Sequence, residues 1–167
     1  MTVREIIIFA MLGTIMFCSK IIMEFLPNIH LLGMLTVTYT VVYRKKALIP
    51  IYIYVLLNGI YAGFNAWWVP YLYIWTVLWA AVMLLPRNMK GKTEAVVCHV
   101  ICAMHGFLFG TIYAPAQAIM FGFSLNETLA WIAAGIPMDV LHGVGNIVVG
   151  FLIFPMAKLL RKLSRVK

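Results

Sequence analysis

Positively charged residues divide this chain into apolar segments at regular intervals. Of thirteen Lys and Arg residues, all except Lys20 lie between apolar runs or at the two ends of the chain. They are Arg4, Arg44, Lys45, Lys46, Arg87, Lys90, Lys92, Lys158, Arg161, Lys162, Arg165 and Lys167. The other connections contain no Lys or Arg. Because cytoplasmic loops of membrane proteins retain positive charge, this alternation predicts six membrane spans with both termini in the cytoplasm.

The composition excludes a soluble domain with a solvated surface. The chain has 167 residues, of which 64% are hydrophobic and 11% charged, and its mean hydropathy is +0.98. At about 20 residues per membrane-spanning helix, six helices leave only short loops. We therefore expect a single transmembrane domain, 1–167, that is not an enzyme. No Walker-type glycine loop is present, so any ATP hydrolysis resides in partner subunits.

The apolar runs and the prolines between them place the expected elements. The predicted spans are 5–25, 28–43, 47–64, 70–85, 93–114 and 138–160. Pro115 is expected to end the fifth helix near Ala114, and Pro137 to break or kink the chain before the last span. Between them, Ser124 and Glu127 have the spacing of a capping box, which predicts a short outer helix over 125–135. The predicted fold is an all-α integral membrane protein, a compact bundle of six transmembrane helices.

This topology gathers polar and aromatic side chains from all six spans in the outer half of the membrane. The candidate ligand-binding residues are Lys20, Asn28, His30, Asn58, Tyr61, Asn65, Trp67, Trp68, Tyr71, Trp75, Tyr113, Gln117, Asp139, His142 and Asn146. Asp139, His142 and Asn146 follow an i, i+3, i+7 pattern and form the strongest group. Polar groups left unpaired in hydrocarbon each cost several kcal/mol. Their convergence predicts a polar, aromatic-lined cavity open to the outside.

Each of these groups also has a structural interpretation. Lys20 and Glu24 are four residues apart, so they can form an ion pair on one helix face. Asn58 and Asn146 can bridge neighbouring helices by hydrogen bonds. The Trp and Tyr residues can anchor the chain at the membrane interface.

The sequence favours neither a metal centre nor a cofactor site. Asp139 and His142 offer two ligands and His30 a third, but no HExxH or His-rich pattern is present. His99 and His105, in the fifth span, are interpreted as core histidines with satisfied hydrogen bonds. The net charge of +8 fits topology and attraction to anionic inner-leaflet lipids better than binding to nucleic acid.

Four segments carry a resemblance to a known family. They are Pro27-Asn-Ile-His-Leu-Leu-Gly33, Arg44-Lys-Lys-Ala-Leu-Ile-Pro-Ile51, Trp68-Val-Pro-Tyr-Leu-Tyr-Ile-Trp-Thr-Val-Leu78 and Pro137-Met-Asp-Val-Leu-His-Gly-Val-Gly-Asn146. With these segments, six spans and inner termini, the chain resembles a substrate-binding S component of an energy-coupling factor (ECF) transporter.

The resemblance implies a subunit that captures a vitamin or similar small organic micronutrient from outside the cell membrane, in a prokaryote the plasma membrane. Such subunits join a membrane coupling subunit and two cytoplasmic ATPases, and they are thought to topple within the bilayer. The loop after the first span, here 26–30, acts as a lid. Family members often dock through an A-x-x-x-A pattern on the first helix. This chain has Ala10, Gly13 and Thr14 instead, a pattern that is only small-x-x-x-small.

The same resemblance argues against a metal cargo, because Met1-Thr2-Val3 lacks the Met-x-His hook of cobalt and nickel transporters. Two other classes of function stay open. One is an ion-coupled secondary transporter of a small organic solute, in which Lys20, Glu24, Asp139 and His142 relay protons. The other is a membrane enzyme that uses His142 with Asp139 as a base pair. The sequence does not identify the ligand.

Overall fold

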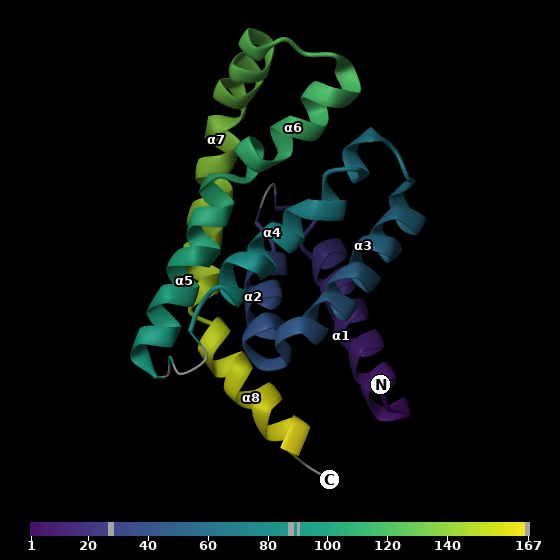
Figure 1. Ribbon diagram of the computed structural model, residues 1–167, viewed down its shortest axis with the longest axis vertical. Coiled ribbons are helices and arrows are strands. Elements are labelled where there is room, and N and C mark those ends of the chain that lie inside the picture. The colour runs from purple at the N-terminus through teal and green to yellow at the C-terminus, as the bar shows by residue number, and fades with distance from the viewer. Residues whose placement is uncertain (27–28, 87–88, 90, 166–167) are drawn as a thin grey trace.

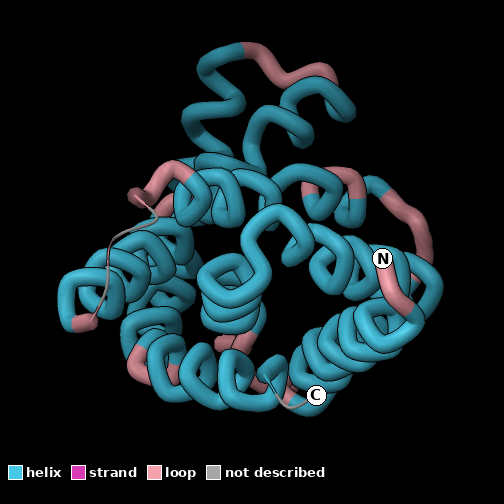
Figure 2. The backbone as a smooth tube through the Cα atoms, turned by 60° about the horizontal axis from the view of Figure 1, so that its bottom comes forward, coloured by secondary structure: helices cyan, strands magenta, loops and turns pink. Residues whose placement is uncertain are grey.

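The computed structural model describes residues 1–26, 29–86, 89 and 91–165, and no strand occurs in this part of the chain (Figure 1). The helices are α1 (Val3–Ile22), α2 (Leu32–Tyr43), η1 (Arg44–Ala47), α3 (Leu48–Ala62), η2 (Ala66–Trp68), α4 (Tyr71–Met83), α5 (Lys92–Phe107), α6 (Phe109–Phe121), α7 (Leu125–Gly150) and α8 (Ile153–Arg165). Loops join them (Figure 2). The all-α class predicted from the sequence is confirmed.

The basic connections lie together at one end of the molecule. In Figure 1 the N-terminus, η1, the start of α5 and the whole of α8 are at the lower end. The turn after α3 and the turn between α6 and α7 are at the opposite end. The topology predicted from the sequence expects such a separation of basic from neutral connections.

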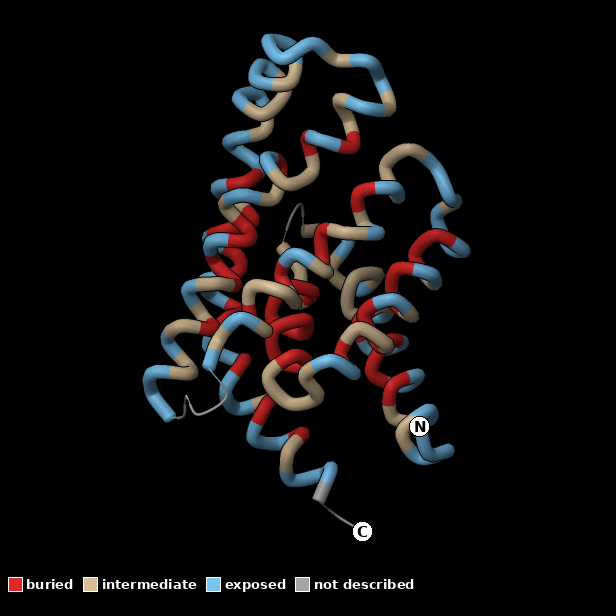
Figure 3. Tube along the Cα trace, in the orientation of Figure 1, coloured by how far each residue is buried: buried red, intermediate tan, exposed pale blue. Residues whose placement is uncertain are grey.

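Helix α2 forms the centre of the bundle. Every residue from Leu32 to Thr40 is buried, and α1, α4, α5, α7 and α8 all contact α2. Figure 3 shows the buried residues concentrated on α2 and on the sides of its neighbours that face it. A helix that is buried on every side must be enclosed by neighbouring elements, and here protein encloses it. Its 12 residues extend about 18 Å, well short of the roughly 30 Å of a bilayer's hydrocarbon core.

Three segments are long and apolar enough to cross a membrane: Val3–Ile22, Ala66–Met83 and Leu125–Gly150. A fourth is the pair α5 and α6, which is bent by 43° at Leu108. Large apolar side chains such as Ile7, Met11 and Ile22 project from the bundle surface. An exterior of this kind is consistent with a membrane protein, because lipid tails are as apolar as these side chains.

Neither Pro115, expected to end a helix, nor Pro137, expected to break or kink one, ends a helix. Pro115 lies inside α6, and the chain breaks seven residues earlier, at Leu108. Pro115 has no N–H to donate to the carbonyl of Thr111 four residues earlier, and α6 continues without that bond. The hydroxyl of Tyr73 on α4 donates to the carbonyl of Ile112, at 2.8 Å. The expected end of the helix near Ala114 is therefore wrong.

Helix α7 also continues through its proline, Pro137, so the expected outer helix 125–135 is the first part of a longer helix. The capping box is confirmed: the Ser124 side chain accepts from the amide of Glu127, whose carboxylate accepts from the amide of Ser124 at 2.7 Å. The expected last span, 138–160, is interrupted instead at 151–152. There α7 ends and the amphipathic α8 begins.

Candidate ligand-binding site

Trp75 is the centre of a cluster of aromatic and imidazole rings between the helices. It is fully buried on α4, and five rings surround it with centroid distances between 5.7 and 6.1 Å. These rings belong to Tyr54 of α3, Tyr71 of α4, His105 of α5, Phe109 of α6, and His30 in the connection between α1 and α2. With His142 of α7, we call this group the Trp75 cluster.

His142 closes the cluster on the side of α7. Its ring centroid lies 4.7 Å from that of His30 and 4.7 Å from that of Phe109. The side chain is buried. Segments far apart in the sequence, before α2 and within α7, are thus joined through two adjacent imidazoles.

Several polar atoms of this region are buried without a hydrogen-bond partner from any described residue. In the Trp75 cluster they are Tyr54 Oη, Trp75 Nε1, His30 Nδ1, His105 Nδ1 and His142 Nε2. Asn58 lies one turn beyond Tyr54 on the same face of α3. Its Oδ1 and Nδ2 are also buried without a hydrogen-bond partner from any described residue. A buried polar group without a partner costs about 1–3 kcal/mol, and native structures contain few of them. Because these atoms are concentrated around Trp75, we take this region as the candidate ligand-binding site.

A cavity of about 170 Å³ lies beside the cluster. It is lined by Lys20, Met23, Glu24, Leu26, Ile29, His30, Tyr71 and Phe109, so His30, Tyr71 and Phe109 belong to both. Lys20 Nζ lies 3.1 Å from Glu24 Oε1. The pair offers a positive and a negative group at one wall, and the aromatic rings form the other wall.

The Asp139 side chain is hydrogen-bonded to the backbone of α6. Both carboxylate oxygens accept from the amide of Gly110, at 2.9 and 3.0 Å. Gly110 is in the first turn of α6, where backbone amides lack partners within the helix and the helix dipole favours a negative charge. A Cβ at Gly110 would stand 2.7 Å from Asp139 Oδ2, so the glycine permits this contact.

Asn146 bridges helices, as its structural interpretation predicted. Its Nδ2 donates to the carbonyl of Cys102 on α5, at 2.9 Å. A Cβ added to Gly33 of α2 or to Gly106 of α5 would come within 3.1 Å and 2.8 Å of Asn146 Nδ2, respectively. The side chain is therefore wedged between two helices, and its Oδ1 has no partner among the described residues.

The candidates near η2 connect α6 to the turn between α3 and α4. The hydroxyl of Tyr113 donates to the carbonyl of Trp67, at 2.7 Å, and the Tyr113 ring lies 6.1 Å from Phe109. Trp67 packs against Tyr71 at 5.7 Å. Gln117 is half-buried one turn beyond Tyr113. These residues border the Trp75 cluster on the side of η2.

Other candidates lie away from the cluster. The Trp68 indole donates to the carbonyl of Val55, at 2.8 Å, and so fixes η2 to α3. Tyr61 is 60% exposed and contacts Phe17 of α1, and Asn65 is exposed. Asn28 lies outside the described residues.

The small residues proposed as a docking face divide into two groups. Ala10 and Thr14 are exposed on α1, and the Thr14 hydroxyl donates to the Ala10 carbonyl at 2.9 Å. Gly13 instead faces α3: a Cβ there would lie 2.6 Å from the side chain of Ile53. Gly13 therefore serves the packing of α1 on α3.

Sequence reasoning missed three members of the cluster, Tyr54, His105 and Phe109. Tyr54 precedes Asn58 by four residues, a spacing that puts both on one helix face and was available as a signal. His105 was interpreted as a core histidine. It is buried and one ring nitrogen meets the carbonyl of Ile74, at 3.1 Å, but its other nitrogen has no partner among the described residues. No sequence signal distinguishes Phe109 from other apolar residues.

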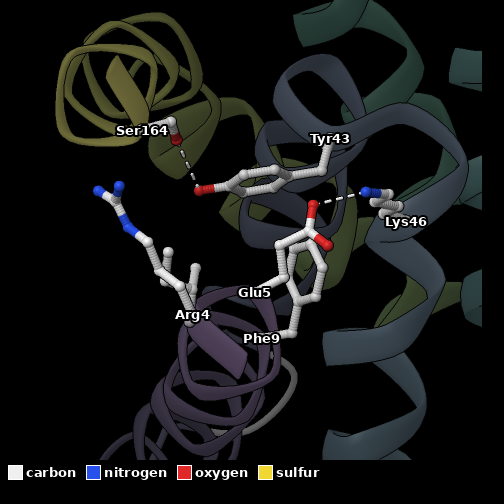
Figure 4. Close-up of a pocket in the computed structure, with 7 residues that line it drawn as sticks. Arg4, Glu5, Phe9, Tyr43, Lys46 and Ser164 are labelled. Carbon is white, nitrogen blue, oxygen red and sulfur yellow. Dashed lines mark hydrogen bonds and ion pairs between the residues drawn. The ribbon is translucent and has the colours of Figure 1, made fainter. Parts of the chain in front are cut away.

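A second pocket lies at the opposite, basic end of the molecule (Figure 4). Lys46 of η1 pairs with Glu5 of α1, at 2.5 Å, and the hydroxyls of Tyr43 and Ser164 are 3.3 Å apart. The first contact joins η1 to α1, and the second joins the end of α2 to α8. The polar groups of this pocket thus bind one another.

The described residues form an all-helical protein in which three helices, or four spans if the bent pair counts as one, are long and apolar enough to cross a membrane. In comparisons with known proteins, no family model, no curated protein and no solved structure matches this chain.

Proposed function

We propose that this protein is a membrane-embedded binding subunit for the uptake of a vitamin or related small organic micronutrient. In this proposal the chain crosses the membrane six times, with α5–α6 and α7–α8 each forming one bent span and the basic end in the cytoplasm. The ligand enters from the outer side and binds at the Trp75 cluster.

The observation that carries the proposal is the set of buried polar atoms around Trp75 that have no described protein partner. Ligand sites are mostly apolar and aromatic, with a few precisely placed polar groups, and the Trp75 cluster has this composition. Ring edges and an amide suit a flat molecule with donors and acceptors on its edge. Lys20 and Glu24 suit a charged substituent.

The size of the cavity implies that the site opens to accept its ligand. A volume of about 170 Å³ is smaller than the roughly 300–1,000 Å³ of typical ligand pockets. Binding a vitamin-sized molecule therefore requires rings of the cluster or the neighbouring connection to move apart. The described arrangement corresponds to a contracted site.

The first test is to identify and measure the bound ligand. We expect native mass spectrometry of the gently purified protein to detect a retained small molecule, which then serves as the probe. Asn58→Ala should weaken its binding at least tenfold, about 1.4 kcal/mol. Asn65→Ala, the same change at an exposed position of the following turn, should leave binding unchanged. Equal affinity in both variants would remove the Trp75 region from the site.

The energy source separates this proposal from its main alternative. A binding subunit of an ECF-type complex co-purifies with a coupling subunit and two ATPases, and its uptake stops when ATP is depleted. Ala10→Leu, on the exposed face of α1, should impair this complex and leave ligand binding intact. Uptake that survives ATP depletion and collapses with an uncoupler would favour an ion-coupled carrier, with Lys20 and Glu24 as its titratable pair.

A further inference from the structure

Helix α8 presents two different faces. Ile153, Ala157 and Leu160 are buried, and α8 packs on α2 and α5. Lys158 and Lys162, one turn apart, are exposed on the other side. Protein thus covers the apolar face of α8, and the face that bears the two lysines is left exposed.

The exposed face of α8 forms a basic groove. A hollow of about 520 Å³ is lined by Phe154, Lys158, Arg161 and Lys162. Arg161 is held in place by Glu94 of α5, with Nη2 3.1 Å from Oε1. Neither Lys158 nor Lys162 has an ion pair with a described residue. The groove therefore retains two uncompensated positive charges beside an oriented guanidinium.

The groove begins where the apolar surface of α7 ends. Phe151 and Leu152, between α7 and α8, are exposed, and so is Phe154. From Phe154 to Lys162 the helix rises about 12 Å. The exposed aromatic residues therefore precede the basic residues along the chain, an order that matches acyl chain, glycerol and phosphate in a phospholipid.

We propose that this groove binds an anionic phospholipid of the cytoplasmic leaflet. The phosphate lies between Lys158 and Lys162 and within reach of Arg161, and the acyl chains lie along Phe154 and the exposed end of α7. Charge complementarity selects an anionic headgroup over a zwitterionic one. The site is separate from the Trp75 cluster, and it rests on the proposed orientation only in assigning the leaflet.

The test compares phosphatidylglycerol with phosphatidylcholine on the full-length protein in detergent, by native mass spectrometry. We expect phosphatidylglycerol to bind at least tenfold more tightly than phosphatidylcholine. Lys158→Gln combined with Lys162→Gln should abolish this preference, whereas Lys158→Arg combined with Lys162→Arg should keep it. As a matched single change, Lys162→Gln should weaken binding more than Lys45→Gln, an exposed lysine at the same end.

Three results would overturn the proposal. One is no preference for phosphatidylglycerol in the parent protein. Another is equal loss in Lys45→Gln and Lys162→Gln, which indicates general charge attraction. The third is displacement of the lipid by millimolar inorganic phosphate, which indicates a site for the free anion. The same spectra also measure the retained micronutrient, which the α8 variants should still bind. Failure of the lipid site can therefore be distinguished from failure of the proposed uptake function.

Discussion

At the scale of single residues, sequence spacing predicted which helix face a side chain lies on better than it predicted which groups that side chain contacts. Asp139, His142 and Asn146 were expected on one face of the last span, and all three are buried on α7. Their partners differ: Asp139 meets an amide of α6, His142 meets two rings, and Asn146 meets a carbonyl of α5. Spacing fixes which residues share a helix face. It contains no information on what the neighbouring helices present to that face.

Asp139→Ala tests the structural role of this carboxylate. The change removes the acceptor for the Gly110 amide and leaves a buried donor in the first turn of α6. We expect a loss of about 1–2 kcal/mol in the free energy of unfolding, measured by unfolding in detergent micelles. Asp139→Asn retains one acceptor oxygen and should lose less. Wild-type stability of Asp139→Ala would mean that the contact contributes nothing to the fold.

At the scale of helices, the positions of the breaks were the least predictable feature. Pro115 was expected to end a helix and Pro137 to break or kink one, yet both lie inside helices. The break falls instead at Leu108, between Gly106 and Gly110. A proline removes one hydrogen bond from a helix and does not by itself determine where the helix ends. Tyr73, on another helix, supplies a donor near Pro115, and a local pattern cannot reveal a partner about 40 residues away in sequence.

The packing of α5 on α7 depends on close backbone approach at Gly106. A Cβ there would lie 2.8 Å from both the Asn146 amide and the Cα of Gly143. Gly106→Ala should therefore destabilise the protein by about 1–3 kcal/mol, because backbone must shift. Gly135→Ala is the matched control on α7, where nothing lies within 4 Å of the added Cβ.

The control should stabilise the protein by about 0.5–1 kcal/mol, because alanine restricts the unfolded chain more than glycine does. Both variants can be compared by thermal unfolding in the same detergent. Effects of the same sign would contradict the close approach of α5 and α7.

At the scale of the whole molecule, the charge pattern predicted the arrangement of the two ends. The basic η1 and α8 lie at the lower end in Figure 1, and the turn after α3 and the turn between α6 and α7 lie at the other. This long-range feature was predictable because it depends on where charges can stay hydrated. The Trp75 cluster was predictable only in part, because its membership depends on how the helices rotate against one another.

Orientation can be tested by labelling single cysteines with a membrane-impermeant maleimide in intact cells. In a Cys18→Ser background, which removes the exposed native thiol, Asn65→Cys should react from outside. Lys45→Cys should react only after permeabilisation. The reverse pattern would place the basic end outside and would remove the proposed route of ligand entry.

Helix α2 has a consequence for tolerance to substitution. On α1, where exposed and buried positions alternate with the helical period, an apolar side chain facing lipid can be exchanged for another at little cost. From Leu32 to Thr40 no position faces lipid, because every residue of this stretch is buried against protein. Variation among functional sequences should therefore recur every three to four positions along α1 and show no periodicity along α2.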